Sequence, residues 1–402
     1  MPQSQLGRLE FIAMMAMMSA TVALSIDGML PALPEIGRTL SPDDINRAQL
    51  VITSFMIGMG VGTFFTGPLS DAFGRKRVLL SGSALFILAS LVCYRADTLD
   101  LMLAARFVQG LGAAGPRVVA LAIIRDLHAG REMARIVSFV MIIFTLVPAI
   151  APTLGHLAVV SGDWRLIYIF FAAFALAGGL WLLLRLPEPL PVEKRRTLAL
   201  PALIAGVREI FSFKVVRYTI TVQSLVFATL IGLLSSIQQI YDISYGRGDS
   251  FHLWFGLIAI LGASAGFLNS ALVRRLGMRY LVSATLAAQI AVSGMMIFAF
   301  SLDLPANLSF GLFVFWQFTL FFQAGMCLGN LNALAMEPLG HIAGLGASVI
   351  SATFTVVAAI LAVPIGLSFN GTAIPLATAV FVASILALWI MVKLKDVPLD
   401  AR

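Results

Sequence analysis

The stretch MMSATVALSIDGMLPALP, residues 17–34, is almost wholly apolar, yet it contains one acidic residue, Asp27. Two prolines follow it, Pro31 and Pro34. An apolar run of about 20 residues is long enough to cross the roughly 30 Å hydrocarbon core of a bilayer as a helix. A carboxylate inside such a helix is costly unless it faces the protein interior or a water-filled path. The stretch therefore predicts a membrane-spanning helix with an acid that has a function.

The composition of the whole chain agrees with this prediction. Of its 402 residues, 59% are hydrophobic and 12% are charged, whereas soluble domains have about 45–50% apolar and about 25% charged residues. We therefore predict an all-α integral membrane protein. The two cysteines, Cys93 and Cys327, stand alone in separate apolar runs, which argues against a disulfide framework or a cysteine metal site.

Polar or Pro/Gly breaks separate twelve apolar runs, which predict twelve transmembrane helices. The longest break, residues 187–214, divides them into two groups of six. We expect two six-helix bundles, residues 1–186 and 215–402, joined by a cytoplasmic linker, residues 187–214. The predicted spans are 10–34, 48–69, 78–94, 100–124, 133–159, 165–185, 216–241, 251–272, 280–301, 308–332, 343–369 and 372–393.

The basic residues predict the orientation of these spans. With both termini in the cytoplasm, the termini and the even-numbered turns hold 20 of the 27 Lys and Arg residues, and the outer turns hold 5. Cytoplasmic loops of membrane proteins carry such an excess. The net charge of +7 then serves topology and attraction to anionic lipid, so we expect a membrane partner and no nucleic acid.

One turn occurs in similar form in both halves. GPLSDAFGRKRVLL (67–80) follows the second span and FLNSALVRRLGMRYLV (267–282) follows the eighth. Gly74 corresponds to Gly277 and Lys76 to Arg279, each pair 203 residues apart. Six-helix halves repeated in the same orientation are a transporter architecture, in which the substrate site lies near the membrane midplane.

Several motifs resemble those of the major facilitator superfamily. The turn GPLSDAFGRKR matches its loop signature, and RFVQGLGAAG (106–115) matches its fourth-helix motif. DGMLPALPEI (27–36) and LVPAIAPTLG (146–155) are similar to motifs of its drug/proton antiporters. The Bcr/CflA-type branch has sequences similar to IIRDL (123–127), ALAM (333–336) and AGLGAS (343–348).

This resemblance extends over nearly the whole chain. It implies a transporter of the bacterial cytoplasmic (inner) membrane that acts as a monomer and exchanges small amphiphilic drugs for protons. Two positions depart from the Bcr/CflA-type pattern: His156 replaces a usual glycine and Leu121 a usual arginine. Arg117 lies one helical turn before Leu121, where it can place a similar charge at another depth.

Asp27 and Arg106 are the predicted proton-coupling residues. Asp27 is the only one of the 20 acidic residues well inside a span. Counted at 1.5 Å per residue, Asp27 lies about 10 Å from the outer end of its span, and Arg106 lies about 9 Å from the outer end of the fourth span. The two residues are therefore at similar depth, and we expect them to form a pair. Burial favours the neutral form of a carboxyl group, and a nearby guanidinium favours its ionised form. A carboxyl group in which these two effects balance can take up and release protons. A static ion pair that fixes helix packing is the structural alternative.

The fourth span has a stripe of Arg106, Gly110, Ala113 and Arg117 on one helix face. Small residues between two arginines leave space for a cavity or for close helix contact of the GxxxG kind. We favour cavity lining and predict that Arg117 contacts the substrate.

The turn after the second span is a predicted gate. Gly74 allows a backbone conformation that other residues avoid, and Asp71 can meet a cation or the positive end of a helix. By the resemblance, its partner is the start of the eleventh span, near residues 343–348. Arg75, with Lys76 and Arg77, also enforces topology.

Pro148, Pro152 and Gly155 are predicted gating residues in the fifth span. Proline removes a backbone hydrogen bond and kinks a helix. In the antiporters that this chain resembles, the motif is thought to block leak; a simple packing kink is the alternative.

The spans of the second half contain no buried acid or base. Amides and aromatic side chains there suit a large apolar cavity with a few orienting hydrogen bonds. We predict Gln223, Gln317 and Phe321 as substrate contacts. The four histidines have no ligand spacing and no P-loop occurs, so we expect no metal, no cofactor and no use of ATP.

The sequence therefore predicts a proton-coupled secondary transporter that exports small amphiphilic drugs or toxic compounds by alternating access. A metabolite exporter or importer on the same fold is the alternative. A channel is disfavoured because no ring of polar residues or filter repeat is evident. An integral-membrane enzyme is disfavoured because the sequence has no nucleophile, acid/base or metal constellation.

Overall fold

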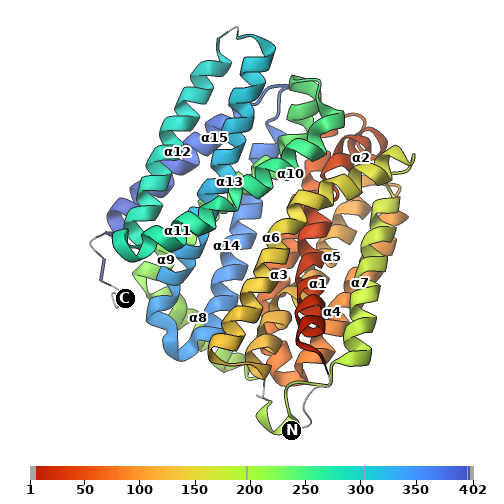
Figure 1. The fold of residues 1–402 in the computed structure, drawn as a ribbon, viewed down its shortest axis with the longest axis vertical. Helices are drawn as coiled ribbons and strands as arrows, with labels where there is room; N and C mark the ends of the chain where they lie inside the picture. Colours follow the sequence, from red (N-terminus) through yellow and green to blue (C-terminus); the bar gives the residue numbers. More distant parts are fainter. Residues whose placement is uncertain (1–5, 196–197, 303, 396, 399–402) are drawn as a thin grey trace. The chain divides into compact units, whose positions relative to one another are not determined.

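The computed structural model describes residues 6–195, 198–302, 304–395 and 397–398 (Figure 1). All regular secondary structure in these ranges is helical. Eleven helical stretches among the described residues are long and apolar enough to cross a membrane. One of them, Ala306–Leu367, has 62 residues, far more than the about 20 needed for one crossing. It turns at Leu339, where φ is −106° and ψ is 17°. The helices on either side, Ala306–Met336 and Ala343–Leu367, have 31 and 25 residues, so each is long enough to span. The described residues thus contain the twelve spans that the sequence predicts.

The chain divides into two compact units. The first comprises residues 1–41 and 54–201. Glycines on its fourth span allow close helix contact: a Cβ atom on Gly110 would lie 2.1 Å from the backbone oxygen of Phe55. Figure 1 shows α1 beside α6 and α7, and all three are in contact. Its helices are α1 (Arg8–Asp27), η1 (Leu30–Ala32), α2 (Leu33–Leu40), most of α3 (Leu50–Phe73), α4 (Arg75–Tyr94), α5 (Leu99–Leu127), α6 (Gly130–Val160), α7 (Leu166–Arg185) and η3 (Val192–Lys194).

The second unit comprises residues 42–53 and 202–402. In it, α9 packs against α13, α14 and α15, and a cluster that includes Val222, Val226, Cys327 and Leu331 is buried. Its helices are η2 (Ile45–Gln49), α8 (Leu200–Ser212), α9 (Lys214–Gln239), η4 (Ile240–Ser244), η5 (Gly248–Ser250), α10 (Phe251–Gly262), α11 (Ser264–Leu276), α12 (Met278–Phe300), α13 (Ala306–Met336), η6 (Glu337–Ile342), α14 (Ala343–Leu367) and α15 (Ile374–Leu394).

Three features were not evident from the sequence. The polar break 187–214 contains helix α8, which joins η6 through a contact of 3.0 Å between Glu209 Oε1 and His341 Nε2. The eighth span is two helices, α10 and α11, interrupted at Ala263. Residues 42–53, at the start of the second predicted span, group with the second unit.

The repeated turn has the same backbone conformation in both units. Gly74 has φ of 103° and Gly277 has φ of 80°, values that side chains of L-residues avoid. Each turn also supplies a cation to the end of the sixth span of its unit. Lys76 Nζ donates to Leu183 O at 2.8 Å, and Arg279 Nη1 donates to Leu394 O at 3.1 Å.

Candidate functional site

Asp27 is the last residue of α1, at the point where the first span changes direction. The chain continues through Gly28 into the 3₁₀ turn η1, which contains Pro31, and then into α2. The residue is only 6% exposed. Its carboxylate lies at the negative end of the α1 dipole and away from bulk water, so its ionised form is costly on both counts.

Gly155 of α6 packs directly on the backbone next to Asp27. A Cβ atom on Gly155 would lie 1.8 Å from Gly28 O, and one on Gly28 would lie 3.3 Å from the Phe171 ring. Only glycine allows this approach of α6 to α1. Pro152 and Pro148, inside α6, lie about one and two turns before it. Gly155, one of the three predicted gating residues of the fifth span, thus contacts the residue that follows Asp27.

Arg106 is fully buried, at 0% exposure. Its Nη2 atom donates to Ser25 O at 3.2 Å and its Nη1 atom to Gln109 Oε1 at 2.5 Å. The guanidinium also lies 4.4 Å from the centroid of the Phe55 ring. The cation is therefore held against the last turn of α1, two residues before Asp27, where free helix carbonyls attract positive charge.

The expected ion pair between Asp27 and Arg106 does not form in this structure. Within the described ranges, the Asp27 carboxylate has no ion pair at 4.0 Å or less. Counting residues along two spans gives their depth, but not the direction in which each side chain points. Arg106 reaches the backbone of α1 instead of the carboxylate.

Gln109 is a residue of this site that the sequence analysis missed. It accepts from Arg106, and its Nε2 atom donates to Ser90 Oγ of α4 at 2.6 Å. Ser90 in turn donates to Phe86 O at 2.7 Å. Gln109 lies three residues after Arg106, a spacing that places two side chains on one helix face, so the RFVQG motif contained the signal.

The stripe on α5 faces α3, which favours the packing alternative over cavity lining. Gly110 contacts the α3 backbone at Phe55, as described above. Arg117 is partly buried, and its Nη1 atom lies 3.4 Å from Met59 Sδ, also of α3. The cavity interpretation is therefore not supported at Gly110.

The Gly74 turn contains a network of charges. Arg75 contacts Asp71 Oδ1 at 2.5 Å and Asp126 Oδ2 at 2.8 Å. Glu188, which follows α7, accepts from the backbone nitrogens of Arg75 at 2.8 Å and Lys76 at 3.1 Å. A carboxylate at the start of α4 stabilises the free N–H groups of that helix. The sequence analysis missed Glu188, although an acidic residue shortly after the end of a span can cap the start of a neighbouring helix.

The three predicted substrate residues of the second unit have different surroundings. Gln317 accepts from the Tyr241 hydroxyl at 2.8 Å. Phe321 packs on α10, with its ring centroid 5.6 Å from that of Phe255. Gln223 is fully buried, and neither polar atom of its amide has a hydrogen-bond partner in the part of the chain that the structure describes.

Gln49 is a second residue that the sequence did not indicate. Its Nε2 atom donates to Gln239 Oε1 at 2.6 Å, and its Oε1 atom accepts from Ser236 at 3.2 Å. Gly366 leaves space for it, since a Cβ atom there would lie 2.3 Å from Gln49 Oε1. These contacts explain why the start of the second span groups with the second unit.

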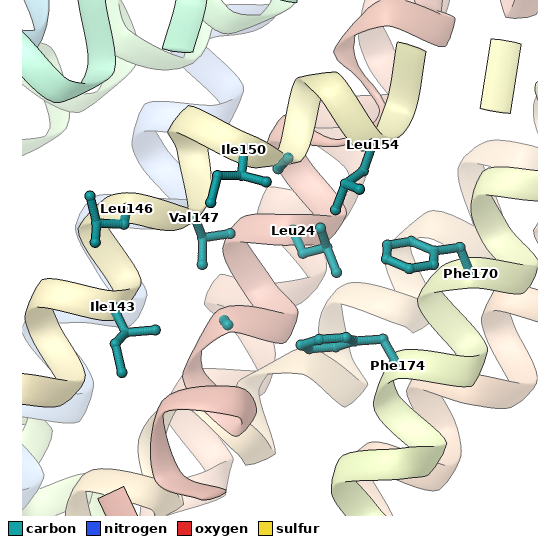
Figure 2. A pocket seen from close by; sticks show the side chains of 10 residues that line it. Leu24, Ile143, Leu146, Val147, Ile150, Leu154, Phe170 and Phe174 are labelled. Carbon is teal, nitrogen blue, oxygen red and sulfur yellow. The ribbon is translucent and has the colours of Figure 1, made fainter. Parts of the chain in front are cut away.

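Figure 2 shows an apolar groove in the first unit, bounded by α1, α6 and α7. Its volume is about 280 Å³. Leu24 lies between Val147 and Ile150 of α6 and Phe170 and Phe174 of α7. No polar side chain lines it among the described residues, so it offers no group that orients a ligand.

Comparison with known proteins identifies the family. The sequence model of the family described as Major Facilitator Superfamily matches residues 11–363 of this chain. The uncharacterized MFS-type transporter YdgK of Bacillus subtilis is 28% identical over 393 residues, 94% of each chain. A bicyclomycin resistance protein homolog of Haemophilus influenzae is 29% identical over 359 residues, 87% of each chain. The second relative agrees with the predicted resemblance to the Bcr/CflA-type branch.

A solved structure shows the same fold. The xylose transporter XylE of E. coli, in a partially occluded inward open conformation, matches with a TM-score of 0.73 and 15% identity, over 96% of this chain and 98% of that one. The family match extends over most of the twelve spans. The chain therefore belongs to the Major Facilitator Superfamily, and it is a multi-pass membrane transporter of small molecules rather than an enzyme.

Proposed function

We propose that this transporter exports small amphiphilic drugs or toxic compounds in exchange for protons, by alternating access. The observation on which the proposal rests most is Asp27, a buried carboxylate at the bend of the first span. Since no described cation pairs with it, a static ion pair does not account for it. The bicyclomycin resistance homolog supports a drug as the substrate.

We propose the following roles for the residues of the site. Asp27 takes up and releases the exchanged proton, and Arg106 holds the last turn of α1 in place beside it. Gly155, Pro148 and Pro152 set how closely α6 approaches this turn. Asp71, Gly74 and Arg75 form the proposed gate, in which Arg75 links the turn to Asp126 of α5. Arg117, Gln223, Gln317 and Phe321 remain proposed substrate contacts.

We also propose that both termini lie in the cytoplasm, at the inner membrane, because the basic residues concentrate in the turns of that side. Lys76 and Arg279, which cap the ends of α7 and α15, belong to this set.

Efflux from cells that lack their main drug pumps tests the proposal. We expect the wild-type protein to lower the cellular content of chloramphenicol or tetraphenylphosphonium, and an uncoupler of the proton gradient to abolish this export. Export that persists after collapse of the gradient would contradict proton exchange. Export of a metabolite, with neither drug exported, would favour the alternative function.

A further inference from the structure

The apolar groove of the first unit has a buried floor and an exposed rim. Ala20 and Leu24 of α1 belong to the floor, and each is 5% exposed. At the rim, Ile150 of α6 is 58% exposed and Phe170 of α7 is 39% exposed. Figure 2 shows these two rim residues on either side of Leu24. The groove is therefore open on one side and closed by α1 on the other.

The open side of the groove is continuous with the surface that meets the bilayer. The helices α1, α6 and α7 all belong to candidate membrane spans. Only 24% of the most apolar 18 residues of α6 are buried, the smallest share for any candidate span among the described residues. The exposed side chains of α6 in and beside the groove include Ile142, Leu146 and Ile150. A wall of an aqueous path would carry polar groups, so these side chains face the hydrocarbon of the bilayer.

A groove of this kind holds an apolar occupant rather than water. Its described lining consists of Ala, Val, Leu, Ile and Phe side chains alone, which cannot bond water. Its volume of about 280 Å³ exceeds that of an apolar cavity of about 150 Å³ that stays dry and binds benzene. An apolar occupant gains the dispersion contacts that the walls of an empty groove lack. In the bilayer, the apolar chains next to the groove are the acyl chains of phospholipids.

The groove leads towards Asp27. Ala20, Leu24 and Asp27 have the i, i+4, i+7 spacing that places residues on one side of a helix. On α6, the lining residue Ala151 is close to the bend of the first span, since a Cβ atom on Gly28 would lie 3.5 Å from Ala151 O. A chain that fills the groove therefore covers α1 to within about one turn of Asp27.

We infer that the groove bounded by α1, α6 and α7 binds one acyl chain of a membrane phospholipid. The chain lies along the side of α1 that leads to Asp27 and keeps water from this side of the last turn of that helix. The apolar walls hold the chain through its shape and need no polar group to orient it. The inference is independent of the proposed drug export, because it depends on the walls of the groove and on their place in the bilayer.

Photolabelling of the wild-type protein tests the inference directly. The probe is phosphatidylcholine with a photoactivatable diazirine in one acyl chain, in vesicles that contain the purified protein, and mass spectrometry locates the labelled residues. Leu176 is the reference position: it is 49% exposed on α7, lies outside the groove, and is two residues from the lining residue Phe174. We expect Leu24 and Phe174 to carry several-fold more label than Leu176.

Two other results of the photolabelling would overturn the inference. Equal label at Phe174 and Leu176 would mean that the groove meets only ordinary boundary lipid. Less label at Phe174 than at Leu176 would mean that a second copy of the chain or another protein segment covers the groove.

Filling the groove with a side chain gives an independent test. Ala20→Phe places a ring on the floor, and Val147→Phe fills the groove from α6 if the first variant does not fold. Ala13→Phe is the matched control, because Ala13 is an exposed alanine of α1 outside the groove. A lipid that binds the folded protein raises its Tm. Phosphatidylcholine added to the detergent-purified protein should therefore raise the Tm of the filled variant less than that of the wild type and of Ala13→Phe. A rise of wild-type size in the filled variant would overturn the inference.

Discussion

The two six-helix units have different interiors. In the first, the buried polar groups include charges: Arg106 bonds Ser25 O and Gln109, and Gln109 bonds Ser90, while the buried acid Asp27 has no ion pair among the described residues. In the second, the buried polar groups of the spans are uncharged, and several have no described partner. A fully bonded polar network fixes one arrangement, whereas an unsatisfied one favours a change of state or a ligand. We propose that proton exchange depends on the first unit and substrate hydrogen bonding on the second.

The repeated turn, in contrast to the interiors, is the same in both units. Gly74 and Gly277 share a positive φ, and Lys76 and Arg279 each bond the end of a helix. The turn serves the fold of each bundle, so the repeat is visible there, while the chemistry of the interiors has diverged.

The largest effect is expected from Arg106→Met. The change removes the donor from Gln109 Oε1 and Ser25 O, and each buried acceptor left unpaired costs about 1–3 kcal/mol. We predict a marked fall in Tm and loss of export. Arg106→Lys should recover part of the stability, since it keeps one charged donor. A Tm of Arg106→Met equal to that of the wild type would show that the charged network does not order the first unit.

Alanine at the two turn glycines compares the units directly. Each change forces a Cβ atom into a left-handed conformation, at a cost of about 1–2 kcal/mol. Gly74→Ala should cost more than Gly277→Ala. A Cβ atom at Gly74 would lie 2.7 Å from Glu188 Oε2, whereas one at Gly277 has open space. The measurement is the Tm of both variants; an equal loss would contradict the role given to Glu188.

A smaller effect, of the opposite sign, is predicted for Gln223→Leu. Because neither atom of this buried amide has a described partner, leucine should raise stability by about 1 kcal/mol. Gln49→Leu is the contrasting variant, since it breaks the bonds to Gln239 and Ser236 and should lower stability. Thermal unfolding of the two purified variants checks this. A fall for Gln223→Leu would mean that its amide is satisfied in the native protein.

The sequence predicted the features that depend on composition along the chain. Apolar runs gave the twelve spans, and a glycine within a basic turn indicated the positive φ at Gly74. Features that depend on side-chain direction were not predictable. Arg106 and Asp27 have matching depths, yet the guanidinium points to Ser25 O. Likewise, nothing in the residues 42–53 indicates that Gln49 bonds Gln239, 190 positions away, because such a contact depends on tertiary packing.

The central claim is that Asp27 carries the exchanged proton. The most direct test is proton movement in proteoliposomes with a pH-sensitive dye inside, after addition of an exported drug. Wild-type protein should move protons against the drug, Asp27→Asn should abolish this flux, and Asp97→Asn should retain it, because that side chain is 92% exposed. Drug-driven proton flux of wild-type size in Asp27→Asn would contradict the account.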